Sequence, residues 1–148
     1  MSRYLSSALS ALRPNVAWTL PGDELLANVV WPAGVVPPTQ AEVDAAILFA
    51  TNEDAATRAR SALTTAIQAY VDAPAKNWGY DSAASAVGYV GDPYPTFNAE
   101  GAAILAFRSA CWAVARDVEK AVRSGARTMP TLEAMLAMLP AAPARPTA

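Results

Sequence analysis

Twelve prolines divide this 148-residue chain into segments, and their positions limit where a helix can form. Proline fixes φ, has no amide N–H and disrupts the interior of a helix or a central strand. Pro14 ends a first helix-forming segment, Pro38 comes just before a second, and Pro74 closes that second one. Two long proline-free stretches remain, residues 39–73 and 96–129, and both carry apolar residues at helical spacing. The pattern predicts a mainly helical chain.

The composition favours helices over membrane spans. Hydrophobic residues make up 53% of the chain, but the mean hydropathy is only +0.18 because many of them are alanine, the best helix former. The longest charge-free run, residues 25–41, contains three prolines and cannot span a membrane as a helix. The first residues, MSRYLSSALSALRP, lack the apolar core of a secretory signal. We therefore expect synthesis in the cytoplasm and no membrane partner.

Charge and residue types narrow the function classes. Acidic and basic residues are interspersed and sum to a net charge of −2, whereas nucleic-acid-binding proteins have a basic face or run. The sequence has no histidine, so it lacks a Ser-His-Asp triad, a Cys-His pair and any histidine-containing zinc site. Its single cysteine, Cys111, lies in an apolar stretch and is expected in the core. We expect no nucleic-acid partner, no metal or cofactor and no enzymatic activity.

Residues 1–38 are predicted to form a small α+β unit. Leu5, Leu9 and Leu12 share one face of a short helix that Pro14 ends. Alternating apolar residues over 15–20 and 26–31, on either side of a Pro-Gly-Asp-Glu turn, predict a β-hairpin. A two-stranded hairpin is marginally stable by itself, so it must lean on the first helix or on another protein chain.

Residues 39–73 are predicted to form a long linking helix. Thr39 and Glu42 fit a capping box at its start. The middle, residues 51–61, is polar and rich in alanine, so it buries little and acts as a spacer or is covered by a partner. The sequence leaves open whether this helix is continuous.

Residues 74–140 are predicted to form a helical domain. Asp81 caps a short helix ending near Gly88, and a long helix follows over 97–124. A final helix, capped by Thr131, turns four side chains inward: Leu132, Met135, Leu136 and Leu139. The tail, residues 141–148, is expected to be extended, and disordered unless something holds it. The fold class is thus mainly α with a small N-terminal α+β unit.

Polar and aromatic residues gather in sequence around the loop before the long helix: Tyr80, Asp81, Tyr89, Asp92, Tyr94, Glu100 and Arg108. As an active site they offer a carboxylate pair with an arginine clamp. As structure, Asp81 caps a helix, and Glu100 favours the positive end of its own helix, with Arg108 two turns on. We favour the structural interpretation. Asp23 and Glu24 indicate a turn rather than a metal loop.

Large aromatic residues are the candidate partner-binding residues. Tryptophan and tyrosine are enriched in protein–protein interfaces, although core packing uses them more often. The residues selected on this ground are Trp18, Trp31, Tyr89 and Tyr94. No catalytic, cofactor-binding or metal-binding residue is assigned.

Two portions of the sequence resemble small proteins from the tail modules of tailed bacteriophages and prophages. The N-terminal portion has an Arg13-Pro14-Asn15 turn, Trp31 at the end of the β unit, and a helix opened by residues 38–42, Pro-Thr-Gln-Ala-Glu. It resembles XkdW-like and tail-fibre-assembly-like proteins.

The second portion, residues 80–140, is similar to the C-terminal region of tail-fibre-associated proteins. Its landmarks occur in order: Tyr80-Asp81, Tyr89, Ala99-Glu100, Phe107-Arg108, Trp112, Pro130-Thr131-Leu132-Glu133 and Leu139-Pro140. Phe107 stands where tryptophan is expected before the arginine, which keeps the aromatic character.

The resemblance implies a non-enzymatic structural protein of a phage tail tip, baseplate or tail-fibre attachment, bridging two virion proteins. It implies no catalytic residues. The expected partners are other tail or fibre proteins, a homo-oligomer is compatible with the sequence, and the expected location is the virion tail after synthesis in the host cytoplasm. A tail-fibre assembly chaperone, absent from the mature particle, is the alternative. A glycoside hydrolase built on paired acids and a polysaccharide-binding protein are less favoured hypotheses.

Overall fold

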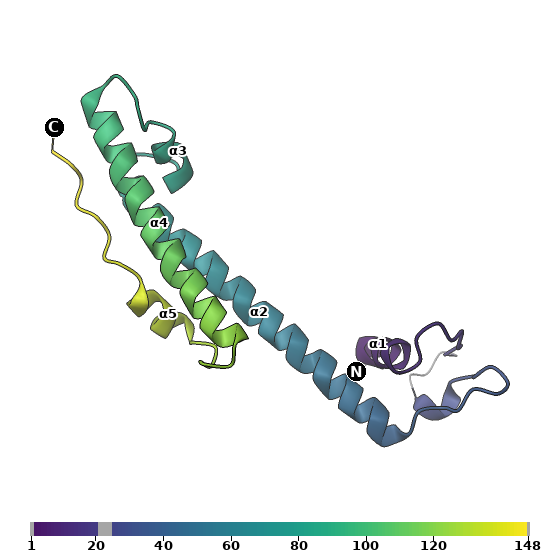
Figure 1. The fold of residues 1–148 in the computed structure, drawn as a ribbon. Coiled ribbons are helices and arrows are strands. Elements are labelled where there is room, and N and C mark those ends of the chain that lie inside the picture. Colours follow the sequence, from purple (N-terminus) through teal and green to yellow (C-terminus); the bar gives the residue numbers. More distant parts are fainter. Residues whose placement is uncertain (1, 21–24, 148) are drawn as a thin grey trace. The chain divides into compact units, whose positions relative to one another are not determined.

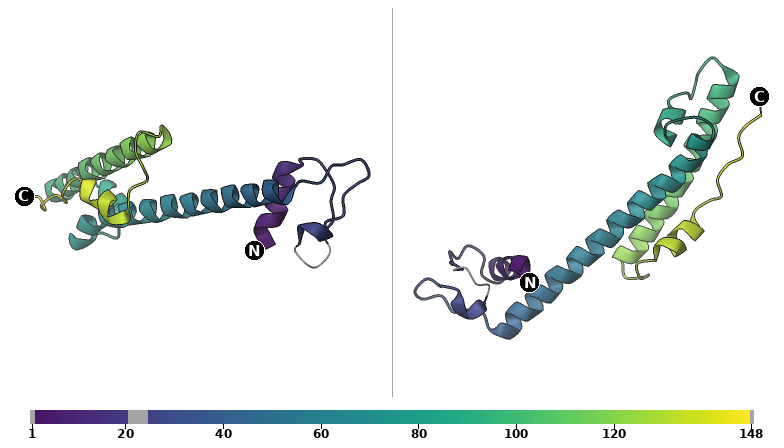
Figure 2. Two further views of the ribbon diagram at one scale, coloured as in Figure 1. Left: turned by 90° about the horizontal axis from the view of Figure 1, so that it is seen from below. Right: turned by 180° about the vertical axis from the view of Figure 1, so that it is seen from behind.

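The computed structural model describes residues 2–20 and 25–147, and this part of the chain is mainly helical (Figures 1 and 2). The elements in order are α1 (Ser2–Leu12), the 3-10 turn η1 (Leu26–Asn28), α2 (Gln40–Asn77), α3 (Ala83–Val87), α4 (Pro95–Arg123) and α5 (Leu132–Met138). The expectation of a mainly α fold is confirmed.

The chain divides into two compact units, residues 1–59 and 60–148, and passes from one to the other within α2. Each unit has its own hydrophobic core. The sequence-based division into residues 1–38, 39–73, 74–140 and 141–148 stays a prediction.

The core of the first unit forms where α1 meets the start of α2. Leu5 and Leu9 are buried on one face of α1, as their spacing predicts, and they cluster with Val29 and Val43. The predicted capping box is confirmed: the Thr39 amide donates to the Glu42 carboxylate at 2.7 Å, and the Glu42 amide donates to the Thr39 hydroxyl at 3.3 Å. Two local features, an apolar stripe and a cap, therefore position both helices.

The predicted β-hairpin is not found in the described residues. Thr19 and Val30 form one isolated antiparallel bridge, with N–H···O distances of 3.1 and 2.8 Å, and residues 26–28 turn as η1. The predicted strands over 15–20 and 26–31 are thus wrong, because a pair without a third strand or a long paired stretch gains too little. The predicted turn at residues 21–24 lies outside the described residues.

Helix α2 runs from Gln40 to Asn77 and is a single helix in the structure. It continues three residues past Pro74, where the sequence predicts its end. Proline removes one amide donor, but the final turn loses little, and the Trp78 amide still bonds to the Pro74 carbonyl at 3.1 Å. Past Asn77 the chain turns at Gly79, whose φ of 99° favours glycine.

The second unit packs the C-terminal part of α2 with α3, α4 and α5. Its core includes Ile67, Ile104 and Cys111, all buried, so the expected core position of the cysteine is confirmed. Helix α4 begins at Pro95, two residues before the predicted start. The cap of α3 is Ser82 and not the predicted Asp81, since Ser82 and Ser85 form a reciprocal capping box.

Helix α5 and the tail close the second unit. The Thr131 hydroxyl accepts from the Ala134 amide at 3.2 Å, as the sequence predicts. Met135 and Leu139 are buried, but Leu132 is exposed, which corrects its predicted inward position. After α5 the tail runs back beside α4 toward the N-terminal end of that helix (Figures 1 and 2).

Gly101 allows α4 to approach the end of α3. A Cβ at this position would lie 2.8 Å from the Ala86 carbonyl oxygen and 3.1 Å from the Val90 amide nitrogen. Both neighbours are backbone atoms, so they cannot rotate away.

We predict that Gly101→Ala lowers the free energy of unfolding by about 1–3 kcal/mol, because overpacking against fixed backbone outweighs the helix propensity. Propensity alone would raise it by about 1 kcal/mol. Urea unfolding measures the change. Ala102→Gly, at the exposed neighbouring position, is the control and should lose only the propensity difference of about 1 kcal/mol. A stabilised Gly101→Ala variant would contradict the close approach.

Candidate functional site

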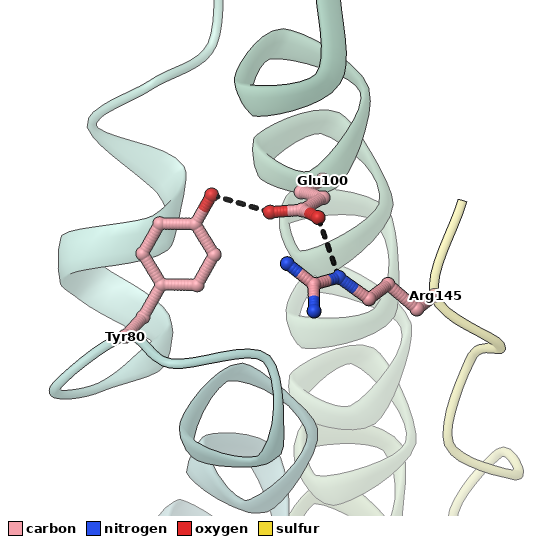
Figure 3. A network of polar contacts seen from close by, with 3 residues as sticks. All are labelled: Tyr80, Glu100 and Arg145. Atoms are coloured by element: carbon pink, nitrogen blue, oxygen red, sulfur yellow. Dashed lines mark hydrogen bonds and ion pairs between the residues drawn. The ribbon is translucent and has the colours of Figure 1, made fainter. Parts of the chain in front are cut away.

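The carboxylate of Glu100 lies at the centre of the candidate site (Figure 3). Glu100 is 1% exposed, and its two oxygens have different partners. The Tyr80 hydroxyl donates to Oε2 at 2.6 Å, and the Arg145 Nε donates to Oε1 at 2.6 Å. The same Arg145 contact is an ion pair. A carboxylate this deeply buried needs such partners, because its burial is otherwise costly.

Three separate segments bring these side chains together. Tyr80 follows the Gly79 turn after α2, and its amide bonds to the Ala75 carbonyl at 3.0 Å. Glu100 lies in the second turn of α4, and Arg145 comes from the tail. A second contact holds the start of the tail, where the Tyr70 hydroxyl donates to the Pro140 carbonyl at 2.9 Å. The network therefore fastens the tail to the helices of the second unit.

The electrostatics favour an ionised Glu100 and a neutral Tyr80. Burial raises the pKa of Glu100, but the hydrogen bonds from Tyr80 and Arg145 and the guanidinium charge lower it, and the net pKa is below its ordinary value. Burial first, and then the hydrogen bond to Glu100, raise the pKa of Tyr80 to about 12. Near neutral pH the phenol thus stays a donor and the carboxylate stays an acceptor.

A series of aromatic rings continues from Tyr80. Its ring centroid lies 5.5 Å from that of Tyr89, which lies 5.3 Å from Phe97. The ring centroid of Tyr94 lies 4.9 Å from that of Phe97. All three contacts are tilted, a favourable geometry for aromatic pairs. Tyr89, Tyr94 and Phe97 are exposed, so this end of the second unit presents aromatic surface beside the buried carboxylate.

The sequence-predicted residues are only partly brought together. Asp81 and Arg108 are exposed, and neither joins Glu100, so the structure does not assemble a carboxylate pair with an Arg108 clamp. Glu100 lies in the second turn of α4, near the N-terminal end of its own helix, but it is buried and bonded to two donors, which the sequence did not indicate. Asp92 has a local role, accepting from the Tyr94 amide at 2.7 Å.

The four candidate partner-binding residues lie in two places. Trp18 and Trp31 are half-buried against the core of the first unit, whereas Tyr89 and Tyr94 belong to the exposed aromatic series of the second. Their partner-binding role stays a prediction. The contact of Arg145 with Glu100 was not predicted, because a tail rich in proline and alanine has no sequence pattern that indicates a folded contact. One feature could have indicated it: Arg145 is the single charged residue of the tail.

A groove of about 440 Å³ lies elsewhere in the second unit. Side chains of α2, α4, α5 and the loop before α5 line it, and most are apolar, with arginines among them: Arg60, Leu63, Thr64, Ile67, Trp112, Ala115, Arg116, Val118, Glu119, Val122, Arg123, Met129 and Met135. The floor includes buried Ile67, Val118 and Met135.

Residues 2–20 and 25–147 contain no group of three or more acidic, cysteine or histidine side chains placed to hold a metal ion. Among the same described residues, none of the helices has the length and apolar character needed to cross a membrane. The chain matches no protein-family model, no curated protein and no solved structure.

We predict that Arg145→Ala lowers the free energy of unfolding by about 1–2 kcal/mol, because it leaves one oxygen of a buried carboxylate without its donor. The expected loss of stability is small for a contact with a buried acid, because the Arg145 side chain is 54% exposed and water screens its charge. Urea unfolding measures it. Arg123→Ala is the control: this arginine pairs with Glu119 at 2.7 Å but is 79% exposed, so the change should stay within about 0.5 kcal/mol. Equal effects of both substitutions would contradict the site.

The two shifted groups predict a stability loss at each end of the pH range. Because the pKa of Glu100 is lowered in the fold, its contribution is complete above its ordinary value of 4.5 and is lost as the pH falls through the folded pKa. Because the pKa of Tyr80 is raised to about 12, its contribution is lost as the pH rises from its ordinary value of 10 toward 12.

The measurement is the free energy of unfolding against pH for the wild type, Glu100→Gln and Tyr80→Phe. Glu100→Gln should remove part of the acid loss, and Tyr80→Phe part of the alkaline loss. Curves that run parallel to the wild type in both variants would contradict these pKa directions.

Proposed function

We propose that this protein is a non-enzymatic structural protein of a tailed bacteriophage that bridges two virion proteins at the tail tip, baseplate or tail-fibre attachment. The observation that carries the bridging role is the division of one small chain into two units with separate cores. Two modules joined by one helix can each bind a different protein.

Each unit offers apolar surface for a partner. In the first unit Leu25, Val30, Val36, Leu48 and Phe49 are exposed. In the second unit the exposed set includes Tyr89, Val90, Tyr94 and Phe97. Exposed apolar residues that cluster are typical of protein–protein interaction sites. The cluster in the second unit contains two of the candidate partner-binding residues, and tyrosine is a favoured interface residue.

The assignment to a phage tail rests on the sequence patterns of residues 13–42 and 80–140. In the second pattern, Tyr80 and Glu100 bond to each other, and Phe107 packs on Tyr70 with a centroid distance of 5.8 Å. These landmarks are therefore residues on which the packing of the second unit depends. That dependence gives a physical reason for proteins of similar pattern to keep them.

A tail-fibre assembly chaperone is the second candidate. The same two units can bind a fibre and its assembly intermediate, and then leave. The two functions differ in one measurable quantity, the amount of protein in finished particles.

Quantitative mass spectrometry of gradient-purified particles against the crude lysate separates them. A structural component is expected at a fixed copy number per particle. Abundance in the lysate with none in the particle would contradict the structural role and favour the chaperone.

A matched pair of variants ties incorporation to the aromatic surface. Tyr94→Ala, at a side chain 58% exposed, is expected to reduce the copy number per particle. Leu132→Ala, at an exposed position of the same unit away from the rings, is the control and should leave it unchanged. Equal incorporation of both variants would remove Tyr94 from the proposed interface.

A further inference from the structure

The contact between Arg145 and Glu100 uses only a small part of what the guanidinium group offers. Its Nε donates to Oε1 at 2.6 Å, and its two Nη groups have no bond within the residues that the structure describes (Figure 3). An arginine has five N–H groups and binds a carboxylate most strongly through two parallel bonds. The Arg145 side chain is also 54% exposed, so water screens its charge. The tail is therefore held by a single, screened contact at this point.

The tail has few other contacts with the second unit. Among the described residues, those from 141 to 147 take part in no backbone–backbone hydrogen bond, and the three alanines of this segment are exposed. The bond from Tyr70 to Pro140 lies before this segment and stays in place when the segment leaves. Release of the tail thus costs little beyond the ion pair of Arg145.

Glu100 needs a second donor whenever the tail is released. Its side chain is buried, and the Tyr80 hydroxyl satisfies only Oε2. An unpaired oxygen of a buried carboxylate is costly, so the position that Arg145 leaves favours another cationic donor. The local charge selects in the same direction, because residues 80–100 contain three acids, Asp81, Asp92 and Glu100, and no lysine or arginine.

The aromatic surface beside this position is left uncovered by the tail. The Tyr80 ring contacts Tyr89, Tyr89 contacts Phe97, and Phe97 contacts Tyr94. The last three rings stay exposed with the tail in place. Aromatic faces attract guanidinium groups and also receive extended, proline-containing segments. An occupant that bonds to Glu100 and covers these rings buries more surface than the tail does, and this difference favours it over the tail.

We propose that the tail is a replaceable occupant of the Glu100 site, and that a partner protein binds there through an arginine on an extended segment that displaces Arg145. The guanidinium group of the partner takes the place of Arg145 on Oε1, while the rest of its segment packs on Tyr89, Tyr94 and Phe97. The tail keeps the acid paired until the partner binds. This inference rests on the proposed partner-binding role of the aromatic surface and does not require the phage assignment.

Peptide binding to the full-length chain tests the proposal. The probe is a fluorescently labelled peptide with the sequence of residues 140–147, Pro-Ala-Ala-Pro-Ala-Arg-Pro-Thr, and fluorescence anisotropy measures its Kd. In the Arg145→Ala variant the protein's own tail no longer competes. We expect a Kd on the order of 0.1 mM, the millimolar effective concentration of a tethered segment divided by a roughly tenfold preference for the bound tail. The wild type should bind the peptide about tenfold more weakly, because its own tail occupies the site.

A matched peptide and a matched variant identify the contact. Replacing the arginine of the peptide by alanine should weaken its binding to the Arg145→Ala protein about tenfold or more, because the peptide then brings no donor to Glu100. Arg123→Ala, which removes the exposed ion pair with Glu119, is the control protein and should bind the original peptide as the wild type does. Circular dichroism confirms that each variant keeps its helix content.

A second peptide tests the role of the rings. It carries two leucines after the final threonine, the end of the tail that runs toward the N-terminal end of α4 (Figure 1). We expect the wild type to bind it about tenfold more tightly than the first peptide, because the leucines are buried on the aromatic surface. Tyr94→Ala should remove most of this gain.

Three results would overturn the proposal. They are a first peptide that does not bind the Arg145→Ala protein, or binds it and the wild type equally; an alanine-substituted peptide that binds as well as the original; and leucines that add no affinity. In each case the contact of Arg145 with Glu100 would be a fixed part of the fold. All of these affinities are independent of the copy number in particles, so this inference and the phage assignment can fail separately.

Discussion

The second unit depends on the pairing of one buried carboxylate. Glu100 is 1% exposed, and an unpaired charge at that depth would cost more than most single contacts in a small domain contribute. Tyr80 and Arg145 supply the two donors at 2.6 Å each, and they come from the turn after α2 and from the tail. Because the acid on α4 needs both donors, it connects that helix to the turn after α2 and to the C-terminal segment.

The same dependence explains why the tail has a defined position. A segment of alanine and proline has few donors and little apolar area with which to hold itself in place. Two contacts supply the order: the carbonyl of Pro140 accepts from Tyr70, and the guanidinium of Arg145 reaches Glu100. The tail is thus held by its own chain, and its expected disorder gives way to these contacts.

The polar middle of α2 needs stabilisation from outside the segment itself. A helix whose residues 51–61 bury little must be stabilised by packing at its ends or along an added partner. Its ends belong to the cores of two units, through Val43 in the first and Ile67 and Val71 in the second.

Local sequence signals predicted the helices and most of their ends. The stripe of Leu5 and Leu9, the Thr39–Glu42 capping box and the Thr131 cap act within one or two turns, so they can be read without knowing the fold. The hairpin prediction was wrong because alternating apolar and polar residues, as over 15–20 and 26–31, indicate only that every second side chain is buried. Here those side chains pack against a helical core, and their backbones do not pair as strands. The cap of α3 was predicted one residue too early, at Asp81 in place of Ser82, because aspartate and serine are both favoured capping residues and the two are adjacent.

What the sequence by itself determined is the mainly helical class, the buried Cys111 and the absence of histidine chemistry. What only the tertiary structure decided is the site: that Glu100 is buried, that Tyr80 and Arg145 pair with it, and that Arg108 does not. The contact between Arg145 and Glu100 spans 45 residues. No spacing rule links such positions, because their meeting depends on how α4, α5 and the tail pack together.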